Sequence, residues 1–383
     1  MDRELKRIWL FSLIVSLTVV ATFFWYVNFT RGHDWTPLGY DTYYYLGYIS
    51  QVVASGPLQF AATQHYVEFL YPILASAPVY LGASSDSVEL VLPVVLACAT
   101  VIANGVLALE SGDLRVAILS VSFSAGWFAI YRMGADFDAN LLAFPMLIMA
   151  TTIILRVARK RSASGPVVVA FMLLVTLAAA AHIESTDFFL VTWMLAFALL
   201  GGRYAIRSNQ LTMFLILAAA LIASPFTLAY LRDVTAGVGG QYCAFPPYWL
   251  EVFGPAAPLA ILGLGILVWS IKGPASNERY KNVLLAWSML ALGIGVLGYV
   301  TIFPIWLSDR ALLLLPIPIV SSLGLLWTID HVPRLTRIPQ TKLLAILAVV
   351  IPLLTVPVVF TYAAPHFRYF LEHGASVVTC SSN

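Results

Sequence analysis

The chain has 383 residues, of which 60% are hydrophobic and only 10% are charged. An ordinary soluble domain carries about 25% charged residues, so this composition excludes a soluble globular protein. The formal net charge is +2, and the basic residues are scattered between apolar runs, so the charge gives no footprint for nucleic acid. We therefore expect an all-α polytopic membrane protein whose partners include membrane lipid but no nucleic acid.

Apolar segments long enough to span a bilayer recur along the whole chain. The first follows Arg3, Lys6 and Arg7, which predicts a retained anchor with a cytoplasmic amino terminus in a multi-pass protein of the cell (plasma) membrane. A span needs about 20 apolar residues, and on this measure we expect about 11 transmembrane helices. They form a single domain over residues 1–363, and residues 364–383 form a short extracytoplasmic tail. The predicted spans start near residues 8, 88, 114, 139, 166, 186, 210, 251, 282, 310 and 343.

The segment "VEFLYPILASAPVYLGA", residues 67–83, is apolar but short, and it contains Pro72 and Pro78. If it crossed the membrane, every later loop would change sides, and "RVARKR" at 156–161 would lie outside, against the positive-inside rule. The sequence therefore predicts a juxtamembrane or re-entrant helix here. The first outer loop then covers residues 29–87 and is long enough to have a function of its own.

Most carboxylates fall on the predicted outer side. Acidic residues contribute little to topology, so this bias indicates a polar site at the outer face. No predicted span has an ionisable residue near its middle, and no matched pair of interrupted segments is evident in the sequence. Both observations argue against an ion-coupled transporter.

The stretch "PLGYDTYYYLGYI", residues 37–49, places Asp41 a few residues before Tyr44, Tyr45 and Tyr48, which recur at helical spacing. Two interpretations stay open. Asp41 caps the helix and the tyrosines belong to an interfacial aromatic belt. Alternatively, Asp41 is a general base at the membrane surface, with Tyr44 and Tyr45 contacting the substrate.

The stretch "DFDANLLAFP" begins with Asp136 and Asp138. In an extended or turn segment these alternate residues point the same way, a geometry that suits a divalent cation such as Mg²⁺ or Mn²⁺, or hydroxyl groups. Asp138 followed by Ala139 and Asn140 is equally typical of an ordinary helix start.

The stretch "HIESTDFF", residues 182–189, offers His182, Glu184 and Asp187 at another outer turn, where His182 and Glu184 are candidate substrate contacts. Their spacing does not match a metal-binding helix face, although a turn can still bring them together. The structural alternative is that Ser185 or Thr186 caps the following helix.

Arg310 in "LSDRALLLLPIP" is predicted at the outer start of a helix, where it opposes both the positive-inside rule and the helix dipole. Such a cation needs a partner. Asp309, a lipid headgroup or a substrate phosphate would serve, and the guanidinium fork suits a phosphate best.

Taken in their order along the chain, these motifs resemble the GT-C fold glycosyltransferases. These enzymes take a sugar from a polyprenyl-phosphate carrier at the outer face of the membrane. The order of "PLGYDTYYYLGYI", "FLYPILASAPVYLG" and "DFDANLLAFP" is similar to that in prokaryotic relatives of protein O-mannosyltransferases, lipid A aminoarabinose transferase and oligosaccharyltransferases. The resemblance implies a hexosyl- or pentosyltransferase, with mannosyl transfer among the candidates. The donor would be a polyprenyl-phosphate-linked sugar of dolichyl-phosphate type, and the acceptor a glycan, lipid or protein.

The resemblance also implies roles for individual residues. Asp41 matches the catalytic base of the first outer loop, Asp136 and Asp138 match an acidic motif for metal or substrate, and Arg310 matches an arginine that contacts the carrier phosphate. The oligosaccharyltransferase signature WWD and its large soluble domain do not occur here, which argues against peptide N-glycosylation. The adjacent acids of the protein O-mannosyltransferases are replaced by "YDT", which argues against protein hydroxyl acceptors.

Two other classes of function fit the same polar outer face. A transporter or flippase of lipid-linked sugars would use it without breaking a bond. A non-catalytic lipid-binding subunit of a glycosylation complex would bind the carrier and tolerate the loss of every outer carboxylate.

Overall fold

The computed structural model describes residues 3–31, 42–63, 68–136, 138–160, 162–201, 210–235, 254–269, 278–298, 310–332 and 338–373, and these residues contain helices and no strand. Four helices in this part of the chain are long and apolar enough to cross a membrane. They coincide with the predicted spans that start near residues 8, 88, 139 and 210. The four are Arg3–Trp25, Ser85–Leu109, Asp138–Lys160 and Gln210–Arg232.

The first half of the described chain contains α1 (Arg3–Arg31), α2 (Thr42–Ser55), α3 (Pro57–Thr63), α4 (Leu70–Tyr80), α5 (Ser85–Leu109), α6 (Leu114–Ala125), α7 (Phe128–Asp136) and α8 (Asp138–Lys160). The second half contains α9 (Gly165–Ala181), α10 (Ile183–Gly201), α11 (Gln210–Thr235), η2 (Gly254–Ala256), α13 (Ala257–Trp269), α14 (Glu278–Gly298), α16 (Ile317–His331) and α17 (Gln340–His373).

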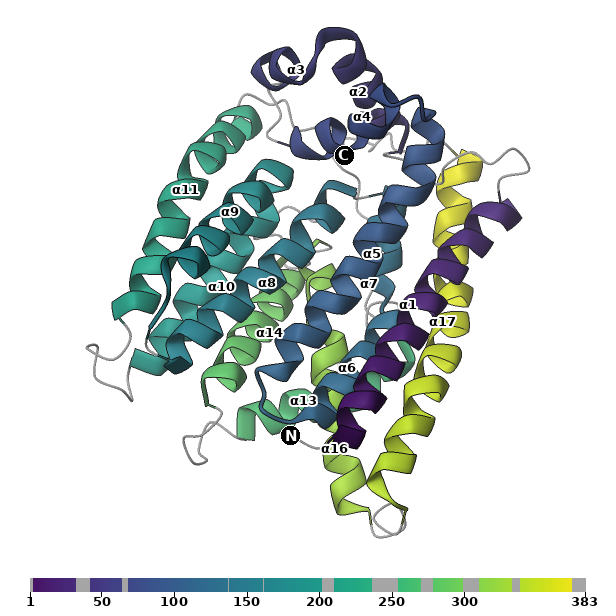
Figure 1. Cartoon of the computed structure of the whole chain (residues 1–383), viewed down its shortest axis with the longest axis vertical. Coiled ribbons are helices and arrows are strands. Elements are labelled where there is room, and N and C mark those ends of the chain that lie inside the picture. Colours follow the sequence, from purple (N-terminus) through teal and green to yellow (C-terminus); the bar gives the residue numbers. More distant parts are fainter. Residues whose placement is uncertain are drawn as a thin grey trace.

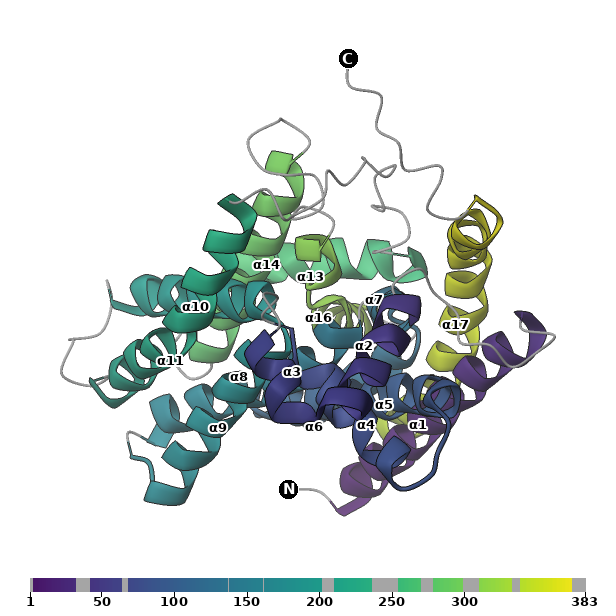
Figure 2. The same ribbon diagram turned by 90° about the horizontal axis from the view of Figure 1, so that it is seen from above.

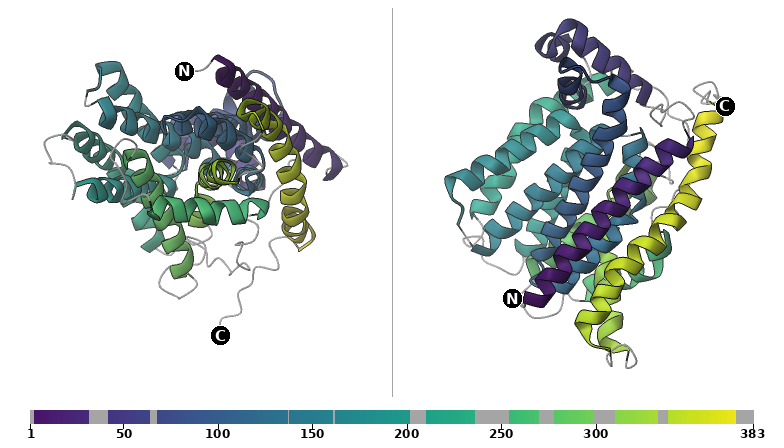
Figure 3. Two further views of the ribbon diagram at one scale, coloured as in Figure 1. Left: turned by 90° about the horizontal axis from the view of Figure 1, so that it is seen from below. Right: turned by 45° about the vertical axis from the view of Figure 1, so that its right-hand side comes forward.

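The short helices α2, α3 and α4 lie together across one end of the long helices (Figure 1), and the view from above shows them over the middle of the bundle (Figure 2). α4 has 11 residues. At 1.5 Å per residue it is about 16 Å long, too short for a hydrocarbon core of about 30 Å. The predicted juxtamembrane segment therefore forms a short helix rather than a span. α1 and α17 pack side by side at one edge of the bundle (Figure 3).

The predicted span that starts near residue 114 is interrupted. α6 ends at Ala125, and α7 begins at Phe128. The backbone carbonyl of Ala125, which the break leaves without its regular helical donor, accepts a hydrogen bond from the Tyr131 hydroxyl. A Cβ at Gly126 would collide with Thr355 of α17, so a glycine is needed where α17 crosses the break.

The predicted span that starts near residue 310 is interrupted as well. A short helical segment from Arg310 stops at Leu313, and α16 starts after Pro316. The Leu314 carbonyl accepts a hydrogen bond of 2.6 Å from the indole N–H of Trp287. Satisfying freed backbone groups with neighbouring side chains is how broken helices survive in an apolar surrounding.

Aromatic side chains fill the middle of the bundle. Phe144 of α8 contacts Trp127, Phe189 and Trp287, with ring centroids 5.4, 6.0 and 6.3 Å away. All four are fully or almost fully buried. By contrast, the apolar side chains on the outer side of α11 are exposed, as expected for a surface that faces lipid. These outward residues include Leu217, Leu221 and Leu228.

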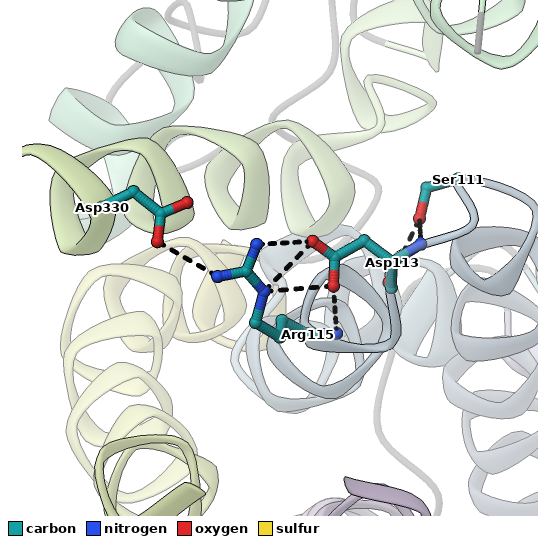
Figure 4. A network of polar contacts seen from close by, with 4 residues as sticks. All are labelled: Ser111, Asp113, Arg115 and Asp330. Atoms are coloured by element: carbon teal, nitrogen blue, oxygen red, sulfur yellow. Dashed lines mark hydrogen bonds and ion pairs between the residues drawn. The ribbon is translucent and has the colours of Figure 1, made fainter. Parts of the chain in front are cut away.

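At the end of the bundle remote from α2–α4, a polar network joins the α5–α6 turn to α16 (Figure 4). Asp113 caps α6 by accepting a hydrogen bond of 2.9 Å from the Arg115 backbone N–H. The Arg115 guanidinium also pairs with Asp113 and with Asp330 of α16, at 2.9 and 3.1 Å. The network fixes the far end of α16, which follows the segment that carries Arg310.

Gly263→Ala is expected to lower the melting midpoint of the detergent-purified protein, because α13 and α16 cross there with backbones in contact. A Cβ at Gly263 would collide with the backbone carbonyl of Val320, which cannot turn aside. Overpacking of this kind costs about 1–3 kcal/mol. Gly265→Ala on the same helix is the matched control, because its Cβ would meet nothing within 4 Å. Equal midpoints for the two variants would contradict the close crossing.

Candidate functional site

His182 lies at the junction of α9 and α10, at the end of the bundle that α2–α4 cover. Its backbone is extended, and its side chain is 1% exposed. The Nδ1 atom accepts a hydrogen bond of 3.1 Å from the Ser185 backbone N–H, so His182 itself caps α10. The predicted capping by Ser185 or Thr186 is therefore wrong, because α10 begins at Ile183, earlier than the sequence pattern suggests. The Thr186 hydroxyl instead donates to the His182 carbonyl.

Four segments meet around this histidine. The Nε2 atom of His182 lies 3.1 Å from Glu68 Oε1 and 3.8 Å from Glu184 Oε2. The second carboxylate is bound on both sides, because Arg310 donates to Glu184 Oε2 and the Tyr230 hydroxyl donates to Glu184 Oε1. We call Glu68, His182, Glu184, Tyr230 and Arg310 the histidine cluster.

The histidine cluster is mostly buried but not closed. The side chain of Glu184 is 9% exposed and that of Arg310 is 21% exposed, while Glu68 is more open at 34%. The predicted contacts His182, Glu184 and Arg310 are thus brought together. Glu184 is one partner of Arg310, whereas Asp309 lies outside the described residues. Glu68 and Tyr230 were not predicted as site residues: Glu68 was only one of many outer acids, and no local signal marks Tyr230.

A second group of polar side chains connects α2 and α4 to α5 and to the start of α8. Tyr71 of α4 donates a hydrogen bond of 3.0 Å to Glu89 of α5, and Tyr45 of α2 accepts one of 3.3 Å from the Ala139 backbone N–H. The rings of Tyr45 and Tyr71 are 4.9 Å apart. The carboxyl groups of Glu89 and Asp138 are close enough to interact. We call Tyr45, Tyr71, Glu89 and Asp138 the tyrosine cluster, and all four are at least 90% buried.

The two clusters are joined through the start of α4. Glu68 lies just before this helix, and Tyr71 lies in its first turn. Burial raises the pKa of the Tyr71 phenol well above its usual value, and the nearby carboxyl groups of Asp138 and Glu89 raise it further. Tyr71 therefore stays protonated and acts as a hydrogen-bond donor to Glu89.

Solved structures share this arrangement of helices. The archaeal oligosaccharyltransferase AglB from Archaeoglobus fulgidus, in complex with an inhibitory peptide and a dolichol-phosphate, matches with a TM-score of 0.67 and 14% identity. The match covers 95% of this chain and 56% of that chain. The chain has the GT-C fold. It spans about half the length of the structures that it matches. No protein-family model matches the sequence, and no curated protein does.

Other structures of an Archaeoglobus fulgidus oligosaccharyltransferase match as well. The apo form matches with a TM-score of 0.60 and 15% identity, covering 95% of this chain and 56% of that chain. A complex with Zn and sulfate gives 0.58 and 13% over 90% of this chain and 52% of that chain. Identities this low establish the fold alone, so the activity of the present chain is a separate question.

Several predicted site residues stay outside the described part. Asp41, directly before α2, is not among the described residues. The side chains of Asp136 and of the whole "PLGYDT" stretch are not described either. Asp136 and Asp138 both occupy helices, at the end of α7 and the start of α8, so the pair does not lie on an extended segment, and of the two predicted geometries only the turn stays open. On α2 itself, Tyr45 is buried in the tyrosine cluster, whereas Tyr44 is 54% exposed.

The described carboxyl groups could supply only part of the ligand set of a divalent cation. Glu89 and Asp138 supply hard oxygen ligands, as Mg²⁺ and Mn²⁺ prefer. Among the described residues, no group of three or more His, Cys, Asp or Glu side chains is arranged to hold a metal ion. A complete cation site therefore needs residues beyond those that the structure describes.

Glu68→Gln is expected to make the melting midpoint fall less on acidification than it does in the wild type. Burial alone raises the pKa of the Glu68 carboxyl, but the hydrogen bond from His182 and the charge of Arg310 together lower it below its usual value of 4.5. Because the folded pKa lies below the unfolded one, the stabilisation by Glu68 is fully present above about pH 4.5 and is lost as the pH falls through the lowered value.

Melting midpoints of wild type and Glu68→Gln, measured from neutral to acid pH, check this expectation. The difference between the two proteins should be small, because about a third of the side chain is exposed. It should narrow below about pH 4.5. A difference that stays constant across the whole range would show that Glu68 gains nothing from His182.

Proposed function

We propose that the chain is an integral-membrane glycosyltransferase that moves a hexosyl or pentosyl unit from a polyprenyl-phosphate donor to an acceptor hydroxyl. The observation that carries the proposal is the GT-C fold, shared over 95% of the chain with a transferase solved with dolichol-phosphate. The acidic, arginine-containing histidine cluster at the α2–α4 end supports it. We place that end on the extracytoplasmic face of the plasma membrane in a multi-pass chain of about 11 spans.

In this proposal, Arg310 holds the carrier phosphate. A guanidinium has five N–H donors on a rigid fork, so it can hold Glu184 along one edge and a phosphate along another. Glu184, itself fixed by Tyr230, sets the direction of the fork. Glu68 and His182 then lie where the sugar hydroxyls would meet the protein, and they can accept and donate hydrogen bonds there.

Asp41 is the proposed general base. It accepts the proton of the acceptor hydroxyl as that oxygen attacks the anomeric carbon of the sugar. The bond between the anomeric carbon and the phosphate oxygen breaks, its electron pair stays on the phosphate, and the configuration at the anomeric carbon inverts. Arg310 stabilises the negative charge on the leaving phosphate. Tyr44 and Tyr45, on the helix that follows Asp41, line the acceptor side.

A divalent cation held by Asp136 and Asp138 would supply further positive charge at the leaving phosphate. The buried carboxyl groups of Asp138 and Glu89 support such a ligand set. The Archaeoglobus fulgidus enzyme has been solved with Zn and sulfate. Mg²⁺ and Mn²⁺ are the cations that we expect for this chain.

A transporter or flippase of lipid-linked sugars is the second candidate, and one observation favours it. The sequence shows no matched pair of interrupted spans, but the described residues contain two interrupted helices, at Gly126 and at Pro316. Interrupted helices are typical of transporters that bind substrate between half-helices. The two breaks therefore weaken the argument from the sequence against this class.

One experiment separates the two functions. The protein is reconstituted with a polyprenyl-phosphate sugar and a mixture of glycan, lipid and peptide acceptors, and free polyprenyl phosphate is measured. A transferase releases the free carrier in proportion to the glycosylated product. Movement of intact donor across the bilayer without release would identify a flippase, and donor binding without either would identify a lipid-binding subunit.

A further inference from the structure

The end of α10 fixes the tautomer of His182. Its Nδ1 atom accepts the Ser185 backbone N–H at 3.1 Å and lies 2.8 Å from the Ser185 hydroxyl oxygen. A proton on Nδ1 would place two N–H groups against each other, so the ring carries its proton on Nε2. Nε2 lies 3.1 Å from Glu68 Oε1 and donates a hydrogen bond to it. His182 is therefore a fixed donor to Glu68.

The two carboxylates of the histidine cluster differ in what they can still bind. Both oxygens of Glu184 are occupied, because Oε2 accepts from Arg310 and Oε1 accepts from Tyr230. Its side chain is also much less exposed than that of Glu68, at 9% against 34%. The lowered pKa of Glu68 keeps its carboxylate ionised at neutral pH, where each oxygen can accept two hydrogen bonds. Glu68 is thus the carboxylate that can accept from a bound molecule.

The surroundings of Glu68 limit where such a molecule lies. The ring that holds Oε1 is 1% exposed, so His182 occupies the buried side of the carboxylate and further donors reach it from the exposed side. The charge of Arg310 acts on Glu68, which places the two groups within reach of one small bound molecule. A molecule with an anionic group and a neighbouring hydroxyl matches this pair.

We propose that Glu68 recognises the transferred sugar by accepting a hydrogen bond from the hydroxyl next to the anomeric carbon, and that His182 is the positioning residue that aims it. The assignment of the carrier phosphate to Arg310 comes from the proposed function, on which this inference rests. In a sugar phosphate this hydroxyl is on the carbon adjacent to the one that bears the phosphate, so it lies closest to Arg310. The donors that fit carry a free hydroxyl at that position.

Equilibrium binding to the detergent-purified full-length protein tests the recognition of this hydroxyl. The probes are polyprenyl-phosphate glucose, polyprenyl-phosphate mannose and the 2-deoxy analogue that these two sugars share. A hydrogen bond to a charged group is worth about 10–100-fold in affinity, so the better sugar should bind more tightly than the analogue by this factor. Glu68→Ala should remove the difference. Asp86→Asn, which changes an exposed carboxylate in the first turn of α5, is the matched control and should keep it.

Two variants of His182 separate its positioning role from its role as a helix cap. Asparagine keeps an acceptor near the place of Nδ1 but loses the donor to Glu68, whereas glutamine keeps a donor near the place of Nε2 but loses the cap. We expect His182→Asn to keep the wild-type melting midpoint and to lose most of the discrimination between sugar and analogue. His182→Gln should keep the discrimination at a lower melting midpoint. The reverse pattern would reduce His182 to a structural residue.

Measuring binding rather than turnover separates this inference from the proposed transfer. Discrimination in binding without any release of polyprenyl phosphate would contradict the transferase and leave the recognition by Glu68 standing. Equal binding of the analogue and both sugars to the wild type would overturn the recognition, even in a protein that transfers sugar. An unchanged ratio of affinities in Glu68→Ala would overturn it as well.

Discussion

Asp41→Asn is expected to lower the turnover number of sugar transfer by about 10²–10⁴-fold, the usual effect of losing a general base. The amide has nearly the same shape as the carboxylate but cannot accept the proton of the acceptor hydroxyl. Donor binding should change little, because the carrier phosphate is assigned to Arg310. Initial rates of polyprenyl phosphate release by the purified variant measure the effect.

The control for this variant is Asp86→Asn, which removes an exposed carboxylate from the first turn of α5 at the same end of the molecule. It should transfer at the wild-type rate. If Asp41→Asn also transferred at a near-normal rate, Asp41 would have no part in the chemistry, and the capping interpretation would stand.

Arg310→Gln is expected to lower kcat/KM by about 10²–10³-fold, because it removes the charge that stabilises the leaving phosphate. It should also destabilise the fold by about 1–3 kcal/mol, since Glu184 is then left largely buried without its cation. Transfer rates and melting midpoints of the same preparation give the two effects separately.

The double variant Arg310→Gln/Glu184→Gln distinguishes a functional role of Arg310 from a structural one. Removing the orphaned carboxylate should restore much of the lost stability but none of the lost transfer. Arg115→Gln breaks another ion pair between helices, to Asp330 at the far end, and should affect stability without affecting transfer. Recovery of transfer in the double variant would reduce Arg310 to a structural partner of Glu184.

The long apolar helices could be predicted from the sequence, because length and hydropathy are local properties. The predicted spans near residues 8, 88, 139 and 210 correspond to helices of sufficient length, and the segment at 67–83 contains only a short one. The breaks at Gly126 and Pro316 could not be predicted. The apolar pattern continues through both breaks. The breaks are stabilised by tertiary contacts, because Tyr131 and Trp287 donate hydrogen bonds to the freed carbonyls.

The candidate site was predictable in its residue types and not in its pairings. His182, Glu184 and Arg310 were recognisable as polar groups at the ends of apolar segments, and they do meet. The pairing of Arg310 with Glu184 joins residues 126 positions apart, and the contact of His182 with Glu68 depends on where α4 is seated. Sequence spacing carries no information about contacts of this kind.

The central claim is that Asp41 and the histidine cluster face one pocket that takes the carrier phosphate. A structure of the full-length protein with a bound polyprenyl-phosphate sugar analogue tests it most directly. The account predicts the phosphate against the Arg310 guanidinium, with the Asp41 carboxylate on the opposite side of the anomeric carbon. A phosphate bound away from Arg310, or an Asp41 side chain turned away from the sugar, would contradict it.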